Sequence, residues 1–268
     1  PALGLWSTWG LSPDRDLAVL PLAGLLLAVV GWLLGVPIGA ALGLAGKRRA
    51  AFHITSSLAN HGFTMGGFVC FMLLGEKGLG LSFIFTAYFM PFIFLVVFPY
   101  ADSARRGGAD FARIAREFIR NPRNMPLYEI MVSLLLHALD VPRPAVSFPL
   151  GALIAVSMSV YYFTLGMTFR PGEIRSAMRE NACVALLKFA VVPALAALVL
   201  GTLPLDPVVR AVIQVQAFMP AAVYSVITAV LYDLDAPFAS GVFVVNTLLF
   251  LAVVLPVIFL LRSAIIPS

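Results

Sequence analysis

Residues 57–67 read Ser57-Leu58-Ala59-Asn60-His61-Gly62-Phe63-Thr64-Met65-Gly66-Gly67, in the middle of an apolar run from about Ala51 to Leu74. That run is long enough to cross a membrane, since a transmembrane helix needs about 20 largely apolar residues. Yet the stretch holds an Asn, a His, a Thr and three glycines. Helix breakers are tolerated in a bilayer core only where the backbone is buried in protein or lines a cavity. The stretch therefore predicts an interrupted transmembrane helix.

A second interruption is predicted at residues 214–221, which read Gln214-Val215-Gln216-Ala217-Phe218-Met219-Pro220-Ala221. Proline removes a backbone N–H and breaks a helix. An acidic residue follows each break at a similar distance, because Glu76 lies 14 residues after Gly62 and Asp233 lies 13 residues after Pro220. Two interrupted spans in corresponding halves are typical of transporters with inverted repeats, which bind substrate at the breaks.

The composition indicates an integral membrane protein. Apolar residues make up 61% of the 268 positions and charged residues only 12%, whereas a soluble domain has about 25% charged residues. The net charge of +5 does not indicate nucleic-acid binding, since the basic residues are spread among loops. Cys70 and Cys183 fall in apolar spans, so we expect packed thiols and no disulfide.

Eight spans are predicted, preceded by a stub at residues 1–10 that we expect to be the tail of an earlier span. A helix and a half would then be missing from the first repeat. When successive loops are assigned to alternate sides of the membrane, one side has five basic residues: Arg15, Lys77, Arg143, Arg210 and Arg262. The other side has twelve and should be cytoplasmic by the positive-inside rule: Lys47, Arg48, Arg49, Arg105, Arg106, Arg113, Arg116, Arg120, Arg123, Arg170, Arg175 and Arg179.

The predicted organisation is a first inverted repeat at 1–100, a cytoplasmic linker at 101–124 and a second repeat at 125–268. Within the linker, Phe111, Ile114 and Phe118 recur at helical spacing among arginines. This pattern predicts an amphipathic helix lying on the membrane surface. A basic loop helix without lipid contact is the alternative.

Further stretches carry a resemblance to a known family. They are Asn60-His61-Gly62-Phe63 with Gly66 and Leu74-Gly75, Arg120-Asn121-Pro122, residues 187–193, Met219-Pro220-Ala221-Ala222, residues 232–235, Ala239-Ser240 and Leu255-Pro256. At these residues the sequence resembles the auxin efflux carrier family of membrane transporters, which includes plant auxin exporters and bacterial organic-acid permeases. The resemblance covers nearly the whole chain. One departure is Phe68, which stands where the family often has proline after the glycine of its first break.

The resemblance implies an all-α membrane fold of ten spans in two inverted repeats of five, as in bile-acid symporters and auxin carriers. The broken helices would cross near the middle of the membrane and bind substrate there. The implied activity is secondary active transport of a small organic anion by alternating access, with coupling to a proton left open. The implied setting is a multi-pass protein of the bacterial inner membrane, with the lipid bilayer as its surroundings and room for a homodimer.

The chemistry of the breaks favours an anion. Backbone N–H groups at the start of a resumed helix carry partial positive charge and stabilise a carboxylate. The expected substrate-binding residues are the polar groups of the breaks and the residues that shape their backbone. They are Asn60, His61, Gly62, Thr64, Gly66, Gln216, Met219, Pro220 and Ala221.

Each candidate has a structural alternative. Asn60 can donate to a carboxylate or cap the broken backbone, and His61 can carry a proton or be a neutral, hydrogen-bonded ring. Thr64 can bond substrate or the carbonyl four residues earlier. The glycines allow either ligand approach or close helix packing.

Gln214 and Lys188 are polar residues of the spans that lie outside this set. Gln214 and Gln216 point to different faces of a helix, so one of them, Gln216, is expected at the site. Lys188 lies within a span and is either functional or extends its ammonium to the cytoplasmic interface.

Other functions are less well supported. A sodium-coupled symporter of the bile-acid type would need acidic ligands, and neither break has an Asp or Glu. A channel or a non-transporting receptor on the same helices is a third possibility. No catalytic motif is present, and His61 with Ser56 or Ser57 is weak support for an intramembrane hydrolase. We therefore expect no enzymatic activity, no cofactor and no metal.

Overall fold

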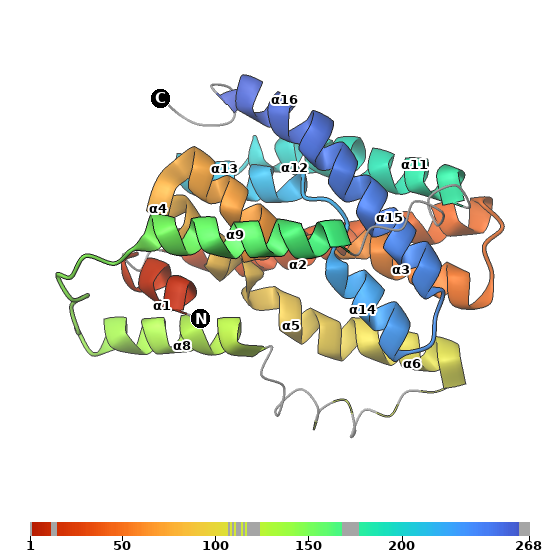
Figure 1. Cartoon of the computed structure of the whole chain (residues 1–268), viewed down its shortest axis with the longest axis horizontal. Coiled ribbons are helices and arrows are strands. Elements are labelled where there is room, and N and C mark those ends of the chain that lie inside the picture. The colour runs from red at the N-terminus through yellow and green to blue at the C-terminus, as the bar shows by residue number, and fades with distance from the viewer. Residues whose placement is uncertain are drawn as a thin grey trace.

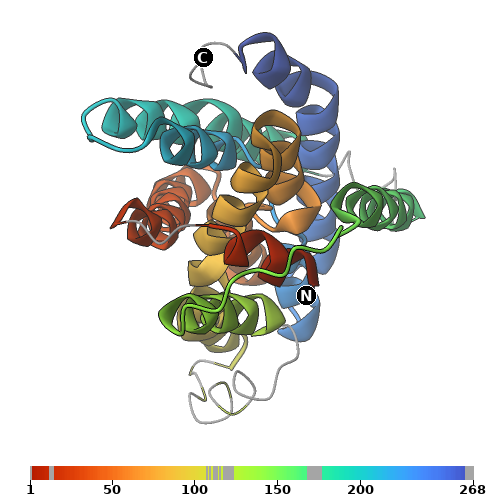
Figure 2. The same ribbon diagram turned by 90° about the vertical axis from the view of Figure 1, so that its left-hand side faces the viewer.

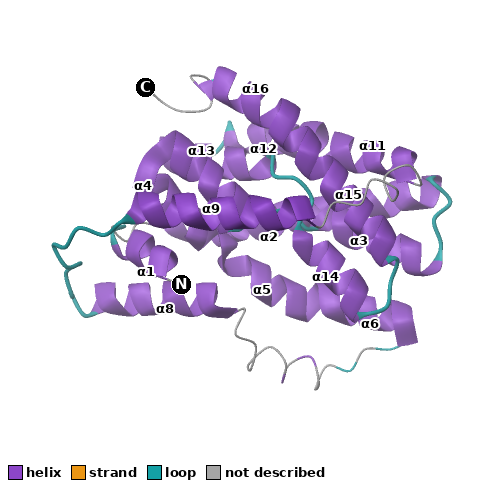
Figure 3. Cartoon of the chain, viewed as in Figure 1, coloured by secondary structure: helices purple, strands orange, loops and turns teal. Residues whose placement is uncertain are grey.

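The computed structural model describes residues 2–11, 15–106, 124–167 and 177–262, together with the single residues 108, 110, 114 and 116. Within these residues the regular structure is helical (Figure 1, Figure 3). Most of the predicted surface helix at 101–124, and the basic residues Arg170 and Arg175, lie outside the described residues.

The helices follow the chain from one end to the other. Their bounds are α1 Ala2–Trp9, α2 Val19–Ala41, α3 Gly46–Ser57, α4 Phe68–Phe85, α5 Phe89–Phe92, α6 Phe98–Arg106, α8 Met125–Ala138, α9 Leu150–Met167, α11 Met178–Leu186, α12 Val192–Leu200, α13 Pro207–Ala217, α14 Val223–Leu231, α15 Ala236–Leu249 and α16 Leu255–Leu260. Four π-helical turns join some of them, at Phe63–Gly67, Ile93–Val97, Leu187–Val191 and Phe250–Val254.

Four helical stretches of the described residues are long and apolar enough to span a membrane: Asp16–Ala41, Phe63–Arg105, Met178–Leu200 and Ala236–Leu260. Two shorter apolar helices lie at Leu127–Ala138 and Leu150–Thr164. The described residues thus form a helical structure with stretches suited to a membrane protein, as the sequence predicts at this coarse level. The second stretch is bent at Gly75, which has φ 65° and ψ −152°.

Helix α2 packs closely against α3 because small residues form its contact face. Its buried positions beside α3 include Ala28, Gly31, Gly35 and Gly39. A Cβ added at Gly31 would lie 2.5 Å from the Ser56 carbonyl oxygen, so a larger side chain there would push the helices apart. This contact holds the end of α3 in place beside the predicted break.

Ion pairs gather at opposite ends of the helices. At one end, Lys47 and Arg48 lie in the first turn of α3. Lys47 lies 2.5 Å from the Asp233 carboxylate, and Arg48 lies 2.5 Å from the Glu180 carboxylate. At the other end Lys77 lies 4.0 Å from Asp206. The loops that these ion pairs join are loops that the predicted topology places on the same side of the membrane.

Helix α9 lies at the edge of the bundle, as the view in Figure 2 shows. Its side chains Val156, Val160 and Phe163 are exposed and apolar. A face of this kind suits contact with lipid in a membrane protein.

Candidate functional site

The two predicted interruptions meet inside the molecule. Helix α3 ends at Ser57, and residues 58–62 are not helical before the chain becomes helical again at Phe63. Helix α13 ends at Ala217, and α14 begins at Val223. Helices are therefore broken at both places that the sequence predicts.

Two backbone hydrogen bonds join the breaks in antiparallel fashion. The Asn60 N–H donates to the Pro220 carbonyl at 2.8 Å, and the Ala222 N–H donates to the Leu58 carbonyl at 3.1 Å. Ala59 and Ala221 face each other between these bonds as an isolated β-bridge. The pairing satisfies backbone groups that would otherwise be unpaired among apolar helices. We call residues 58–62 and 218–222 the crossing.

The first break brings two polar side chains into the protein interior. Asn60 is 6% exposed, and its Nδ2 donates to the Tyr161 hydroxyl of α9 at 3.1 Å. His61 is 2% exposed, and its Nδ1 lies 2.6 Å from the Tyr88 hydroxyl. The Phe85 ring packs edge-on against the imidazole, with centroids 5.0 Å apart. Both side chains are thus held by tyrosines in a largely apolar setting.

Thr64 lies one turn after Asn60 and contacts it. Its Oγ1 is 3.5 Å from the Asn60 Oδ1. The backbone carbonyl of residue 60, which the sequence offers as an acceptor for Thr64, does not accept this bond, so that prediction is wrong. The acceptor is the side-chain oxygen of Asn60. Because the helix is broken at Asn60, the Asn60 carbonyl instead accepts from the Gly66 N–H at 3.1 Å.

Glycine at position 66 is required by close approach to the second broken helix. A Cβ there would lie 2.1 Å from the Gln216 Oε1 and 2.8 Å from the His61 carbonyl oxygen. At Gly62, in contrast, an added Cβ would meet nothing within 4 Å. Gly62 and Gly66 therefore differ: packing requires a glycine at position 66, and space is open at position 62.

Gln216 and Gln214 point to different places, as the sequence predicts. Gln216 is fully buried beside Gly66, with its Nε2 4.0 Å from the Cys70 sulfur, and its Oε1 has no hydrogen-bond partner among the described residues. The Gln214 Nε2 instead donates to the Pro193 carbonyl at 3.2 Å. Gln216 thus lies beside the first break, and Gln214 does not.

The remaining second-break candidates contribute shape and backbone. Met219 and Ala221 are fully buried in the core. Pro220 supplies the carbonyl that Asn60 uses. Ser225, one turn on, donates to the Ala222 carbonyl at 2.6 Å, so its hydroxyl is bonded within its own helix.

The Lys188 ammonium lies at the buried end of α3, beside the crossing, so the prediction that it reaches the interface is wrong. The residue is 3% exposed, and its Nζ donates to the Ser57 carbonyl at 3.1 Å. Ser57 is the last residue of α3, where carbonyls lack helical partners and carry partial negative charge. These carbonyls explain why the ammonium turns inward.

Sequence reasoning missed Tyr88 and Tyr161. Tyr88 is one aromatic residue among many in the segment 83–94, and Tyr161 lies in an apolar helix beside Tyr162. Neither position stands out by spacing, because the hydroxyl partner comes from a distant element. The only available signal was that a buried His or Asn needs a partner.

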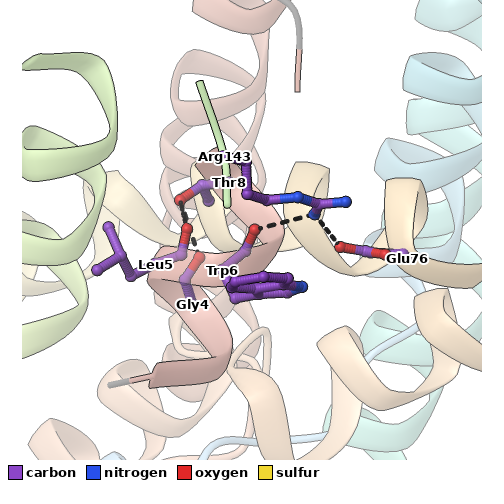
Figure 4. Close-up of polar contacts among 6 residues, drawn as sticks. All are labelled: Gly4, Leu5, Trp6, Thr8, Glu76 and Arg143. Carbon is purple, nitrogen blue, oxygen red and sulfur yellow. Dashed lines mark hydrogen bonds and ion pairs between the residues drawn. The ribbon is translucent and has the colours of Figure 1, made fainter. Parts of the chain in front are cut away.

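Arg143, in the loop between α8 and α9, contacts Trp6 of α1 and Glu76, which follows the bend at Gly75 (Figure 4). Arg143 pairs with Glu76, and its Nη1 lies 3.4 Å from the Trp6 carbonyl oxygen. The guanidinium also lies over the Trp6 ring, 4.8 Å from its centroid. Among the described residues no group of three or more His, Cys, Asp or Glu side chains is arranged to hold a metal ion.

Comparison of the chain with protein-family models and with curated proteins found no match.

Proposed function

We propose that this protein is a secondary transporter that moves a small organic anion, a carboxylate, across the membrane by alternating access. The substrate would bind at the crossing. The observation that carries the proposal is the buried antiparallel pairing of two broken helices, Asn60 to Pro220 and Ala222 to Leu58, inside an apolar helical protein.

An anion suits this place for three reasons. Helices resume at Phe63 and Val223, and the N–H groups of a first helical turn have no helical partners and carry partial positive charge. Asn60 adds an amide donor, and Lys188 adds a cation. Neither break contains an Asp or Glu that would repel a carboxylate.

We propose the finer architecture on the same ground. It comprises two inverted repeats, at 1–100 and 125–268, joined by the linker 101–124, in an auxin efflux carrier-like protein of the bacterial inner membrane. Support comes from the antiparallel direction of the two breaks and from the pairing of Lys47, at the start of α3, with Asp233, which follows α14.

Reconstituted liposomes test the proposal. Labelled lactate, malonate, malate and indole-3-acetate are offered separately, with protein-free liposomes as the control for passive entry of the undissociated acid. Saturable uptake that is accelerated by internal unlabelled acid is expected for a carrier. Flux that neither saturates nor shows this counterflow would indicate a channel, and binding without flux would indicate a receptor.

A sodium-coupled symporter is the second candidate, and the observation that favours it is the unpartnered Oε1 of buried Gln216. An amide oxygen is a suitable ligand for sodium, although the nearby Lys188 ammonium would repel the ion. A sodium gradient imposed separately from a pH gradient separates the two candidates. Uptake that follows sodium would favour the symporter.

A further inference from the structure

Lys188 is a buried cation whose hydrogen-bond partner is a neutral carbonyl. Its ammonium donates to the Ser57 carbonyl at 3.1 Å, and no carboxylate of the described residues forms an ion pair with it. The residue sits in the π-helical turn Leu187–Val191, a local irregularity that often marks functional positions. A charge buried without an opposite charge is costly, so it needs a counter-ion or must give up its proton.

The segments packed against this turn offer no fixed counter-ion. Helices α2, α11 and α12 pack against the turn, and of these α2 and α12 contain no ionisable side chain. Helix α11 carries Arg179, Glu180 and Cys183, and Glu180 is paired with Arg48 at 2.5 Å. The ionisable residues of α3 are basic or histidine: Lys47, Arg48, Arg49 and His53. His61, four residues after Ser57, is neutral or cationic and so supplies no negative charge.

We infer that Lys188 carries the coupling proton of transport, so that one proton and one carboxylate cross together. The inference rests on the proposed function, since it needs an anion at the crossing. The buried ammonium and the bound carboxylate balance each other's charge, and each is unfavourable there alone. Anion binding and protonation of Lys188 are therefore thermodynamically linked.

The linkage gives a balanced transport cycle. On one side of the membrane the neutral amine of Lys188 takes a proton from water, and the carboxylate binds beside the ammonium. On the other side the carboxylate leaves, an N–H bond of the ammonium breaks, and the proton passes to water while the electron pair stays on Nζ. A monocarboxylate is then moved without net charge.

The wild-type protein provides the first test. Liposomes take up whichever of lactate or indole-3-acetate is better transported, under an imposed pH gradient or an imposed potassium-diffusion potential. A gradient of one pH unit, acid outside, should drive protein-dependent accumulation of up to about tenfold, because one proton accompanies each anion. A membrane potential alone should change the rate little. Uptake that follows the potential and ignores the pH gradient would overturn the inference and leave the transporter standing.

Variants test whether Lys188 is the group that carries the proton. Lys188→Arg keeps the charge but does not release its proton at these pH values. It should keep counterflow and lose pH-driven accumulation. Lys188→Met should lose pH-driven accumulation and bind the acid more weakly. Lys77→Met removes an exposed lysine at the far end of the helices and is the matched control, with pH-driven accumulation retained.

A binding measurement covers the case in which a variant does not fold. Titrating the purified wild-type protein with the same acid in buffers of different ionisation enthalpy should show uptake of about one proton per anion bound. No proton uptake would overturn the inference, as would pH-driven accumulation by Lys188→Met equal to wild type. If the wild-type protein shows no saturable uptake of any acid, the proposed function fails and this inference fails with it.

Discussion

The first broken helix places polar side chains at the crossing, whereas the second places mainly backbone and apolar groups there. Asn60 and His61 extend from the first break to tyrosines on other elements. The second break offers the Pro220 carbonyl, and its neighbours Met219 and Ala221 are buried and apolar. Two breaks of similar outline therefore differ in what they contribute: the first brings mainly polar side chains, and the second brings mainly backbone groups and apolar side chains.

The two breaks also resume as helices in different ways. After Gly62 the chain passes through the π-helical turn Phe63–Gly67 before α4, whereas after Ala222 it enters the regular helix α14 directly. Glycines allow the first arrangement, because Gly66 packs against Gln216. The second depends on a proline that cannot donate to the preceding turn. The comparison predicts that added bulk is tolerated least at Gly66.

Gly66→Ala should have the largest effect. Its Cβ would fall 2.1 Å from the Gln216 Oε1 and 2.8 Å from a backbone oxygen, so the two broken helices must separate. Overpacking of this kind costs about 1–3 kcal/mol or more. We expect a lower thermal unfolding temperature in detergent or loss of monodisperse protein in size-exclusion chromatography.

Gly62→Ala is the matched control, because an added Cβ there meets nothing within 4 Å and φ is −65°. It should unfold at nearly the wild-type temperature. Equal destabilisation by both substitutions would show that backbone freedom, and not the contact with Gln216, makes glycine necessary in the first break.

Asn60→Ala should lower transport without unfolding the protein. Losing a hydrogen bond to a charged ligand costs about 1.5–3 kcal/mol, roughly 10- to 100-fold in apparent affinity. The backbone bond from residue 60 to Pro220 is kept, so the unfolding temperature should change little. Uptake kinetics measure the effect. Gln214→Ala, an amide that points away from the crossing, should leave them unchanged.

Pro220→Ala should have a smaller effect on stability than Gly66→Ala. Alanine keeps the carbonyl that pairs with Asn60 but relaxes the unfolded chain, at a cost of about 0.4–1 kcal/mol. The new N–H can bond back toward the Gln216 carbonyl and extend α13, so transport should fall. Unchanged uptake with unchanged stability would mean that the pairing, and not the proline, keeps the second break open.

The smallest effect is expected at the exposed pair of Lys47 and Asp233, which joins the start of the first broken helix to the end of the second. The hydrogen bond and charge of Lys47 hold the pKa of the Asp233 carboxyl below its ordinary value. Its contribution to stability is therefore present above the ordinary aspartate pKa and is lost as pH falls through the lowered one.

Asp233→Asn should thus slightly lower the unfolding temperature at neutral pH, with the difference vanishing in strong acid. The left-handed backbone at this position, φ 50°, suits asparagine as well as aspartate. A difference that persists in strong acid would assign the effect to some other contact of Asp233.

Prediction from sequence succeeded where a residue type conflicts with its surroundings. Polar residues and glycines within an apolar run located the first break, and Pro220 located the second. Helical geometry separated Gln216 from Gln214, since side chains two apart point to different faces. The all-helical membrane class followed from composition.

Prediction was weakest where the partner lies far away in the chain. The tyrosines that bind Asn60 and His61 come from α9 and from the turn before α5. The direction of Lys188 was also misjudged, because a span end is visible in sequence, whereas the carbonyls at the end of α3 are not. Each of these contacts depends on tertiary packing.

The pairing of Leu58 with Ala222 also has a consequence for biogenesis. The two residues lie in opposite halves of the chain, and residues 58–62 leave the ribosome long before 218–222 are made. Until then the peptide groups of the first break lack the strand-like partner that satisfies them. The nascent chain must therefore shelter that segment in water or in another protein, and the order of membrane insertion has to allow the late arrival of its partner.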